Sequence, residues 1–210
     1  NASPVPSAAS DLSATSQTAF RQVGQCLSGE DAQLNVLYVL DASSSLAEDT
    51  DRDRLRGKIL AQAIDQLGIL SQDRKVFVAV SSFDLDYQER LPWQQVDADS
   101  AASTADWAEK QYDWWGAGRG TNWLAALEGG DQTMRESPDS KTACKMMVWL
   151  TDGGINVNGD KSDIQANASA MARICGTDPV TGSPVNEAAV VNSIRSSDVH
   201  LVGVLLRSEQ

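Results

Sequence analysis

The chain contains very little histidine and cysteine. Its single histidine is His200, and its three cysteines among 210 residues are Cys26, Cys144 and Cys175. His200 falls within an apolar stretch that predicts a core strand, so a Ser-His-Asp triad has no evident general base. Neither a G-x-S-x-G nucleophile elbow nor a G-x-x-x-x-G-K-[ST] phosphate loop is present. The cysteines include no C-x-x-C pair and match no zinc or redox signature.

Long apolar runs and positive charge are also lacking. No run approaches the roughly 20 apolar residues that a membrane-spanning helix requires. The net charge is −12 and the isoelectric point is about 4.4, so the phosphates of nucleic acids and anionic membranes would be repelled. We therefore expect neither nucleic-acid binding nor direct membrane insertion. The acidity can serve solubility alone, and it is also compatible with a cation site.

Apolar strands alternate with helical patterns along the chain, which predicts an α/β fold with a doubly wound, mostly parallel sheet flanked by helices. Buried strands are expected at 34–40, 75–81, 145–150 and 199–206, and helices at 52–70, 101–112, from about Thr121, at 162–174 and at 187–195. The segment 88–96 contains Pro92 and is at most an edge strand. In the helix 52–70, Leu55, Ile59, Ala63, Ile64 and Leu67 are expected to face the core.

The domain organisation predicted from composition is simple. Residues 1–16 are rich in Ser, Ala and Pro and indicate a flexible leader. Residues 17–210 form one domain whose core begins at about residue 34. Because the sequence stops directly after a core strand, we expect further covering elements beyond residue 210.

The cysteines allow one disulfide. Cys26 precedes the first predicted strand and Cys144 precedes a later one. Adjacent parallel strands would bring the two to the same edge of the sheet, which predicts a Cys26–Cys144 bridge. The alternative is three inert buried thiols.

Oxygen-bearing side chains follow two of the predicted strands and one glycine-rich turn. Asp41, Ser43 and Ser45 come directly after 34–40, Thr121 follows the turn 116–120, and Asp152 follows 145–150. The carboxyl ends of parallel strands meet at one edge of a sheet, where open α/β folds place their sites. Hard oxygen ligands suit Mg²⁺, Mn²⁺ or Ca²⁺. Since hydroxyls are neutral, a bound cation would stay partly uncompensated and could accept an anionic oxygen from a partner.

Each of these residues also has a local explanation. Asp41, Ser43 and Ser45 can cap a turn or helix, Thr121 can be a helix N-cap, and Asp152 can form an Asx-turn. Any one of them alone favours the local explanation. The five together favour a metal site.

The pattern Asp41-x-Ser43-x-Ser45, Thr121 and Thr151-Asp152-Gly153 resembles the metal-ion-dependent adhesion site of von Willebrand factor type A domains. The resemblance spans about residues 34–206. It implies that Ser43, Ser45 and Thr121 contact Mg²⁺ (or Mn²⁺ or Ca²⁺) directly, that Asp41 and Asp152 do so directly or through water, and that an acidic side chain of a protein ligand completes the shell.

The same resemblance implies a non-enzymatic adhesion or recognition module that binds host matrix or surface proteins, as in pilus-tip adhesins. The segments around Cys144 and Cys175 are also similar to secreted or cell-surface proteins of Gram-positive bacteria. Trp114 and Trp115 lie before Thr121 and could form a rim for a protein or glycan, or one could pack inward. Trp149 falls within a predicted core strand and is expected to be structural.

Two other functions are compatible with these residues. Asp41 could act as the nucleophile of a Mg²⁺-dependent hydrolase or phosphatase. However, position 43 is Ser where an aspartyl phosphatase needs a second carboxylate. Alternatively, the chain could be a structural surface-protein module with a vestigial site.

Overall fold

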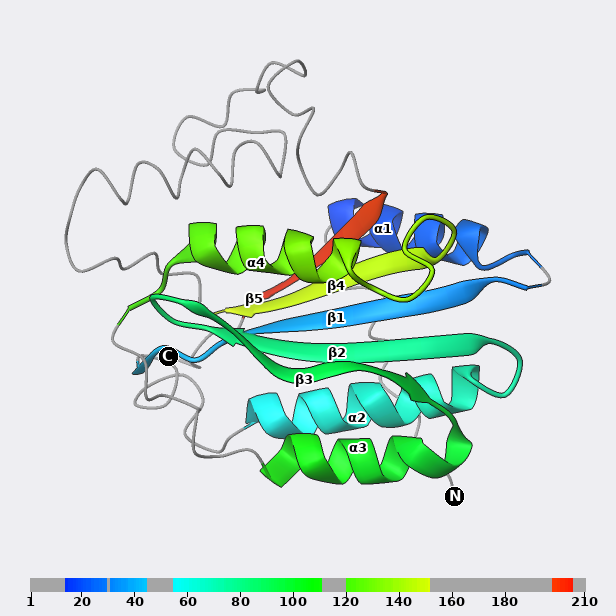
Figure 1. Cartoon of the computed structure of the whole chain (residues 1–210), viewed down its shortest axis with the longest axis horizontal. Coiled ribbons are helices and arrows are strands. Elements are labelled where there is room, and N and C mark those ends of the chain that lie inside the picture. The colour runs from blue at the N-terminus through cyan, green and yellow to red at the C-terminus, as the bar shows by residue number, and fades with distance from the viewer. Residues whose placement is uncertain (1–13, 30, 45–54, 111–119, 152–197, 206–210) are drawn as a thin grey trace, which may run out of the picture.

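The structure is a computed structural model that describes residues 14–29, 31–44, 55–110, 120–151 and 198–205. Within these ranges the chain forms an α/β unit (Figure 1). The helices are α1 (Ala14–Cys26), α2 (Leu55–Leu70), α3 (Ala98–Lys110) and α4 (Trp123–Arg135). The strands are β1 (Gln33–Asp41), β2 (Lys75–Phe83), β3 (Tyr87–Val96), β4 (Cys144–Thr151) and β5 (Val199–Leu205).

The five described strands form one mixed, mostly parallel sheet in the order β3-β2-β1-β4-β5. β1 lies in the centre and pairs in parallel with β2 and β4, while β5 is parallel to β4. β3 is antiparallel to β2 and lies at the edge, in agreement with its proline. The predicted fold class and these strands are confirmed. The helices predicted at 162–174 and 187–195 lie outside the described residues.

Helices cover both faces of the sheet because the side chains of β1 alternate between them. Leu34, Val36, Tyr38 and Leu40 pack on the face that carries α2 and α3, which lie side by side. Leu37 and Val39 pack on the face that carries α4. Every residue of β1 is buried, and each fully buried Val or Leu contributes about 1.5 to 3 kcal/mol. Packing on both faces holds β1 in place, and it thereby positions the side chain of Asp41 at the end of the strand.

The inward face of α2 differs from the prediction at Ile59, and the side chain of Leu55 lies outside the described residues. Leu60 and Ile64 are buried, whereas the side chain of Ile59 is 39% exposed. Ile59 and Ile64 are five residues apart, which is about 140° around a helix, so they do not share one narrow face. The face that packs on the sheet is centred on Leu60 and Ile64, with Leu67 at its side.

Two adjacent glycines let α4 approach the sheet closely. A Cβ added at Gly129 would lie 2.2 Å from the ring of Tyr87, and one at Gly130 would lie 2.8 Å from the end of Met147. Glycine inside a helix costs about 1 kcal/mol relative to alanine. The close contact explains why this cost is tolerated in the middle of α4.

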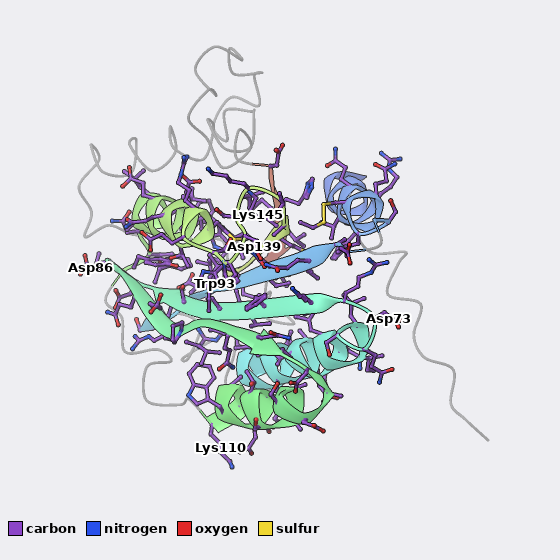
Figure 2. All side chains as sticks on the ribbon, turned by 45° about the vertical axis from the view of Figure 1, so that its right-hand side comes forward. Asp73, Asp86, Trp93, Lys110, Asp139 and Lys145 are labelled. Carbon is purple, nitrogen blue, oxygen red and sulfur yellow. A yellow bond between two sulfur atoms is a disulfide. The ribbon has the colours of Figure 1, made fainter. Side chains whose placement is uncertain are left out.

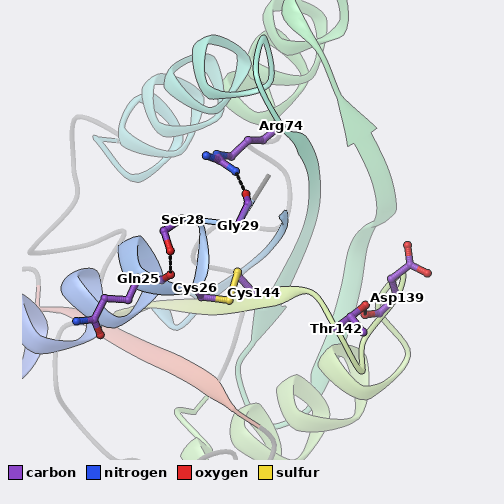
Figure 3. Close-up of a disulfide and its surroundings, with 8 residues drawn as sticks. All are labelled: Gln25, Cys26, Ser28, Gly29, Arg74, Asp139, Thr142 and Cys144. Carbon is purple, nitrogen blue, oxygen red and sulfur yellow. Dashed lines mark hydrogen bonds between the residues drawn. A yellow bond between two sulfur atoms is a disulfide. The ribbon is translucent and has the colours of Figure 1, made fainter. Parts of the chain in front are cut away.

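The amino end of the sheet is closed by a disulfide. Helix α1, which the sequence did not predict, ends at Cys26, and Cys26 is bonded to Cys144 at the start of β4 (Figure 3). Val23 of α1 packs with the cluster on the α2 side of the sheet. The predicted pairing is therefore confirmed, and it joins residues 118 positions apart in the sequence.

Candidate metal centre

Asp41 is the last residue of β1 and its side chain is fully buried. Its Oδ1 accepts a hydrogen bond of 2.9 Å from the backbone N–H of Ser43. Its Oδ2 accepts one of 2.7 Å from the hydroxyl of Thr151, at the end of β4. These two hydrogen bonds fix the orientation of the carboxylate. A carboxylate held in this way presents hard oxygen to the carboxyl edge of the sheet.

A buried arginine lies at the same place. Arg56, which belongs to α2, is 1% exposed and donates a hydrogen bond from Nη1 to the backbone carbonyl of Asp41. Burying a guanidinium is costly unless it is paired and hydrogen-bonded. The end of β1 therefore carries formal charges of both signs in the protein interior.

Residues at the β2–β3 turn form backbone hydrogen bonds with the segment that carries Ser43 and with the segment that carries Thr121. The N–H of Ala42 donates to the carbonyl of Phe83 at 2.8 Å, and the N–H of Asn122 donates to the carbonyl of Asp84 at 2.6 Å. Phe83 and Asp84 are consecutive, so the residues that follow β1 and precede α4 are tied to neighbouring points of one turn. Figure 2 shows this end of the sheet at the label of Asp86 and the opposite end at the label of Asp73.

The hydroxyl residues of these two segments are buried. Ser43 and Thr121 are each 3% exposed. Thr121 is not the N-cap of α4, contrary to the local explanation considered from the sequence. That position is taken by Asn122, whose side chain accepts a hydrogen bond of 3.2 Å from the N–H of Ala125. Helix capping therefore does not account for Thr121.

The remaining predicted residues lie outside the described part of the chain. Ser45, Asp152, Trp114 and Trp115 belong to the segments 45–54, 152–197 and 111–119, and their positions stay predictions. In the residues that are described, no group of three or more His, Cys, Asp or Glu side chains could hold a metal. One oriented carboxylate with serine and threonine hydroxyls nevertheless fits Mg²⁺, Mn²⁺ or Ca²⁺, because all are hard oxygen donors.

Sequence reasoning gave no role to Thr151 or Arg56. Thr151 could have been found because Leu150 is paired with Leu40, which places residue 151 opposite residue 41. Arg56 precedes Leu60 and Ile64 at intervals of four, so it falls on the buried face of α2. An arginine in line with the apolar residues of a predicted helix was the sequence signal that Arg56 is buried.

Three aromatic side chains form a layer on the α4 face near this edge. Trp149 makes edge-to-face contacts with Phe83 and Trp123, with ring centroids 5.5 Å and 5.7 Å apart. Such pairs are worth about 0.5 to 1.5 kcal/mol beyond their burial. The buried indole N–H groups of Trp123 and Trp149 have no hydrogen-bond partner within the described ranges. Trp149 is 4% exposed, as its predicted structural role requires.

No family model and no curated protein matches the chain. Solved structures with partial similarity include the pilus adhesin SpaC from Lactobacillus rhamnosus GG, at 18% identity over 60% of this chain and 16% of the other, with a TM-score of 0.47. The PilB minor pilin from Streptococcus sanguinis is 22% identical over 60% of this chain and 31% of the other, with a TM-score of 0.45. The vWF domain of the type V pili tip protein Mfa5 from Porphyromonas gingivalis is 18% identical over 60% and 39%, with a TM-score of 0.41.

At these scores the similarities establish neither family nor function. The chain spans less than two fifths of each of these three proteins. Among the described helices, none is both long and apolar enough to cross a membrane. The function must therefore be argued from the chain's own residues.

Proposed function

We propose that this chain is a metal-dependent adhesion or protein-recognition module. The observation that carries the proposal is the buried Asp41 carboxylate, which Ser43 and Thr151 orient by hydrogen bonds at the carboxyl edge of the sheet. The segment of Thr121 is hydrogen-bonded to the β2–β3 turn at the same edge. A carboxylate at the end of a parallel strand serves no packing purpose, since burying it costs free energy. A divalent cation at this edge would offset that cost.

In the proposed site, Asp41, Ser43, Ser45, Thr121 and Asp152 hold Mg²⁺, with Mn²⁺ or Ca²⁺ as alternatives. The cation supplies an electropositive point that an acidic side chain of a protein ligand can bind. Trp114 and Trp115 are proposed as the rim that contacts the same ligand, or a glycan on it. The ligand class is a host matrix or surface protein.

The proposed location of the chain is outside the cell, in a secreted or cell-surface protein. The Cys26–Cys144 disulfide supports this proposal because disulfides persist mainly in oxidising compartments.

Thermal unfolding with and without cation tests the site. A ligand at 100 times its dissociation constant stabilises the folded state by about 2.7 kcal/mol, so Mg²⁺ or Mn²⁺ should raise the melting temperature measurably. Asp41→Asn and Ser43→Ala should abolish this increase. Asp106→Asn and Ser103→Ala, which change exposed residues of α3, are the matched controls and should retain it. An unchanged melting temperature in the wild type with saturating Mg²⁺, Mn²⁺ and Ca²⁺ would refute the site.

A binding assay tests the recognition function. Immobilised extracellular-matrix and surface proteins should capture the chain in the presence of Mg²⁺, and a chelator or Asp41→Asn should release it. The competing phosphatase function predicts hydrolysis of p-nitrophenyl phosphate that is lost in Asp41→Asn. Such hydrolysis would contradict our proposal, whereas capture that survives both the chelator and Asp41→Asn would show that the metal site is not used.

A further inference from the structure

We infer that the Cys26–Cys144 disulfide is a redox-controlled latch, which holds helix α1 against the sheet and frees it when an external thiol opens the bridge. The inference goes beyond the proposed function and does not depend on the cation site. It rests on the packing of α1, on a glycine inside this helix, and on the unequal exposure of the two cysteines.

In the part of α1 whose side chains are described, few apolar contacts support the disulfide. From Phe20 to Cys26 every residue is exposed except Val23, which is buried in the cluster on the α2 side of the sheet. Leu27, just after the helix, is half-buried against the same cluster. A helix of 13 residues is marginal by itself in water, so α1 depends strongly on its covalent bond to β4.

Gly24 weakens α1 without serving its packing. A Cβ added at Gly24 would meet nothing within 4 Å, whereas one at Gly129 or Gly130 of α4 would collide with Tyr87 or Met147. The glycines of α4 permit a close approach to the sheet, and Gly24 has no such purpose. Since glycine lowers the stability of a helix relative to alanine, Gly24 favours the opening of α1.

The two cysteines of the bridge differ in exposure. Cys26 is exposed, whereas Cys144 is 3% exposed at the start of β4. An external thiolate therefore attacks Sγ of Cys26, and exposed disulfides are the ones that serve as labile or regulatory bridges.

The exchange proceeds in two steps. First the Cys26–Cys144 bond breaks, the attacking sulfur forms a mixed disulfide with Cys26, and Cys144 leaves as a thiolate that takes a proton from water. If the attacking molecule is a dithiol, its second sulfur then displaces the thiolate of Cys26, which is also protonated. The dithiol becomes a disulfide, and its two electrons have reduced the bridge.

The chain has a fixed point directly after α1. Arg74, which follows α2, donates a hydrogen bond of 2.7 Å from Nη1 to the carbonyl of Gly29 (Figure 3). The next element, β1, begins at Gln33 and is buried along its whole length. Once the bridge is open, α1 therefore swings about residues 27–29 while the strands keep their pairing. The surface that it leaves belongs to β4 and β5.

The first experiment locates the attack. The folded chain is treated with glutathione in a Cys175→Ser background, so that the third cysteine does not exchange with the bridge. After free thiols are alkylated, peptide mass spectrometry should find the first glutathione adduct on Cys26. A first adduct on Cys144, or a bridge that opens only in denaturant, would overturn the inference.

Limited proteolysis then distinguishes a latch from a bridge that only stabilises the whole fold. With dithiothreitol as the dithiol, the initial rate of tryptic cleavage after Arg21 of α1 should rise at least about tenfold relative to cleavage after Lys145 of β4. An unchanged rate after Arg21 would show that packing alone holds α1. An equal rise at both positions would show that the bridge stabilises the whole fold, and either result would overturn the latch.

A substitution inside α1 tests the same opening. In the reduced chain, Gly24→Ala should slow cleavage after Arg21 by up to about fivefold, the equivalent of the difference in helix propensity between glycine and alanine. Gly203→Ala is the matched control, because a Cβ there also meets nothing within 4 Å but belongs to β5. Its cleavage rate after Arg21 should stay within about twofold of the wild type. No slowing in Gly24→Ala, or equal slowing in the control, would overturn the inference.

Discussion

The two ends of β1 are both buried and polar, but they differ in charge. At the amino end, the amide of Asn35 donates to the hydroxyl of Ser137 at 2.9 Å and to the carbonyl of Pro138 at 2.6 Å, and Gln33 donates to both Asn35 and Pro138 at 2.9 Å. At the carboxyl end, the buried groups include the carboxylate of Asp41 and the guanidinium of Arg56.

Neutral amides that hydrogen-bond to fixed groups of the chain have satisfied donors and acceptors, and they need no further partner. Buried charges respond to any ion or acidic group that reaches them. We therefore expect substitutions at the amino end to change stability alone. Substitutions at the carboxyl end should change cation affinity as well as stability.

The largest effect is expected for the disulfide at the amino end. Replacing Cys26 and Cys144 together by Ala should lower the free energy of unfolding by about 4 kcal/mol, because the bridge closes a loop of more than 100 residues in the unfolded chain. Urea unfolding measures this loss. Cation affinity should stay within twofold, since the bridge lies at the far end of the sheet.

A reducing agent provides the control for the disulfide. It should lower the stability of the wild type by the same amount and leave the double variant unchanged. A parallel loss of cation affinity would show that the two ends of the sheet are coupled, and the distinction between them would then fail.

The second prediction concerns the amide network. Asn35→Leu removes the donor to Ser137 and Pro138 and should cost about 2 to 3 kcal/mol, the usual penalty for leaving buried polar groups without a partner. Gln95→Leu, on the exposed side of the edge strand β3, should change stability by less than about 0.5 kcal/mol. Urea unfolding of both variants checks this difference. Equal losses would mean that burial of the network contributes nothing.

The third prediction applies to the carboxyl end. Thr151→Val removes the hydrogen bond to Asp41 and should weaken Mn²⁺ binding about tenfold, while stability falls by about 1.5 kcal/mol. Thr151→Ser keeps the hydroxyl and should restore the affinity. Calorimetric titration and urea unfolding are compared for the same samples. A loss of stability with unchanged affinity would place Thr151 outside the metal site.

The sequence was sufficient to predict the sheet because its strands are strongly patterned. The apolar run of β1 predicts a strand that is covered on both faces, and every residue of β1 is buried in the structure. The edge position of β3 followed from Pro92, and the Cys26–Cys144 bridge followed from the order of the elements. Helix α1 was not predicted, since its sequence has few large apolar residues and follows a leader of similar composition.

The site was harder to predict because it depends on register rather than composition. Asp41 and Ser43 could be selected from their place after a strand, but the contact between Thr151 and Asp41 requires the pairing of β1 with β4. The N-cap was assigned to Thr121 as an alternative, although Asn122 is at least as good a capping residue and lies one position closer to the helix. Arg56 was overlooked because a charged residue on an apolar face is usually assigned to solvent.

The smallest effect is expected at Asp97, an exposed carboxylate at the amino end of the sheet, just before α3. Its Oδ1 accepts hydrogen bonds from the N–H and the hydroxyl of Ser100, both at 2.8 Å, and from the N–H of Asp99 at 3.1 Å. These bonds, with the backbone bond to Ser100 first, lower the pKa of Asp97. A folded-state pKa below the unfolded value of about 3.9 contributes stability that is present above about pH 4 and lost as pH falls through the folded pKa. Asp97→Ala should therefore melt slightly below the wild type at neutral pH, with a gap that narrows as the pH falls below the unfolded value, whereas Asp97→Asn keeps a cap that does not titrate. A gap that does not change with pH would show that the charge of Asp97 does not contribute to the stability of the folded chain.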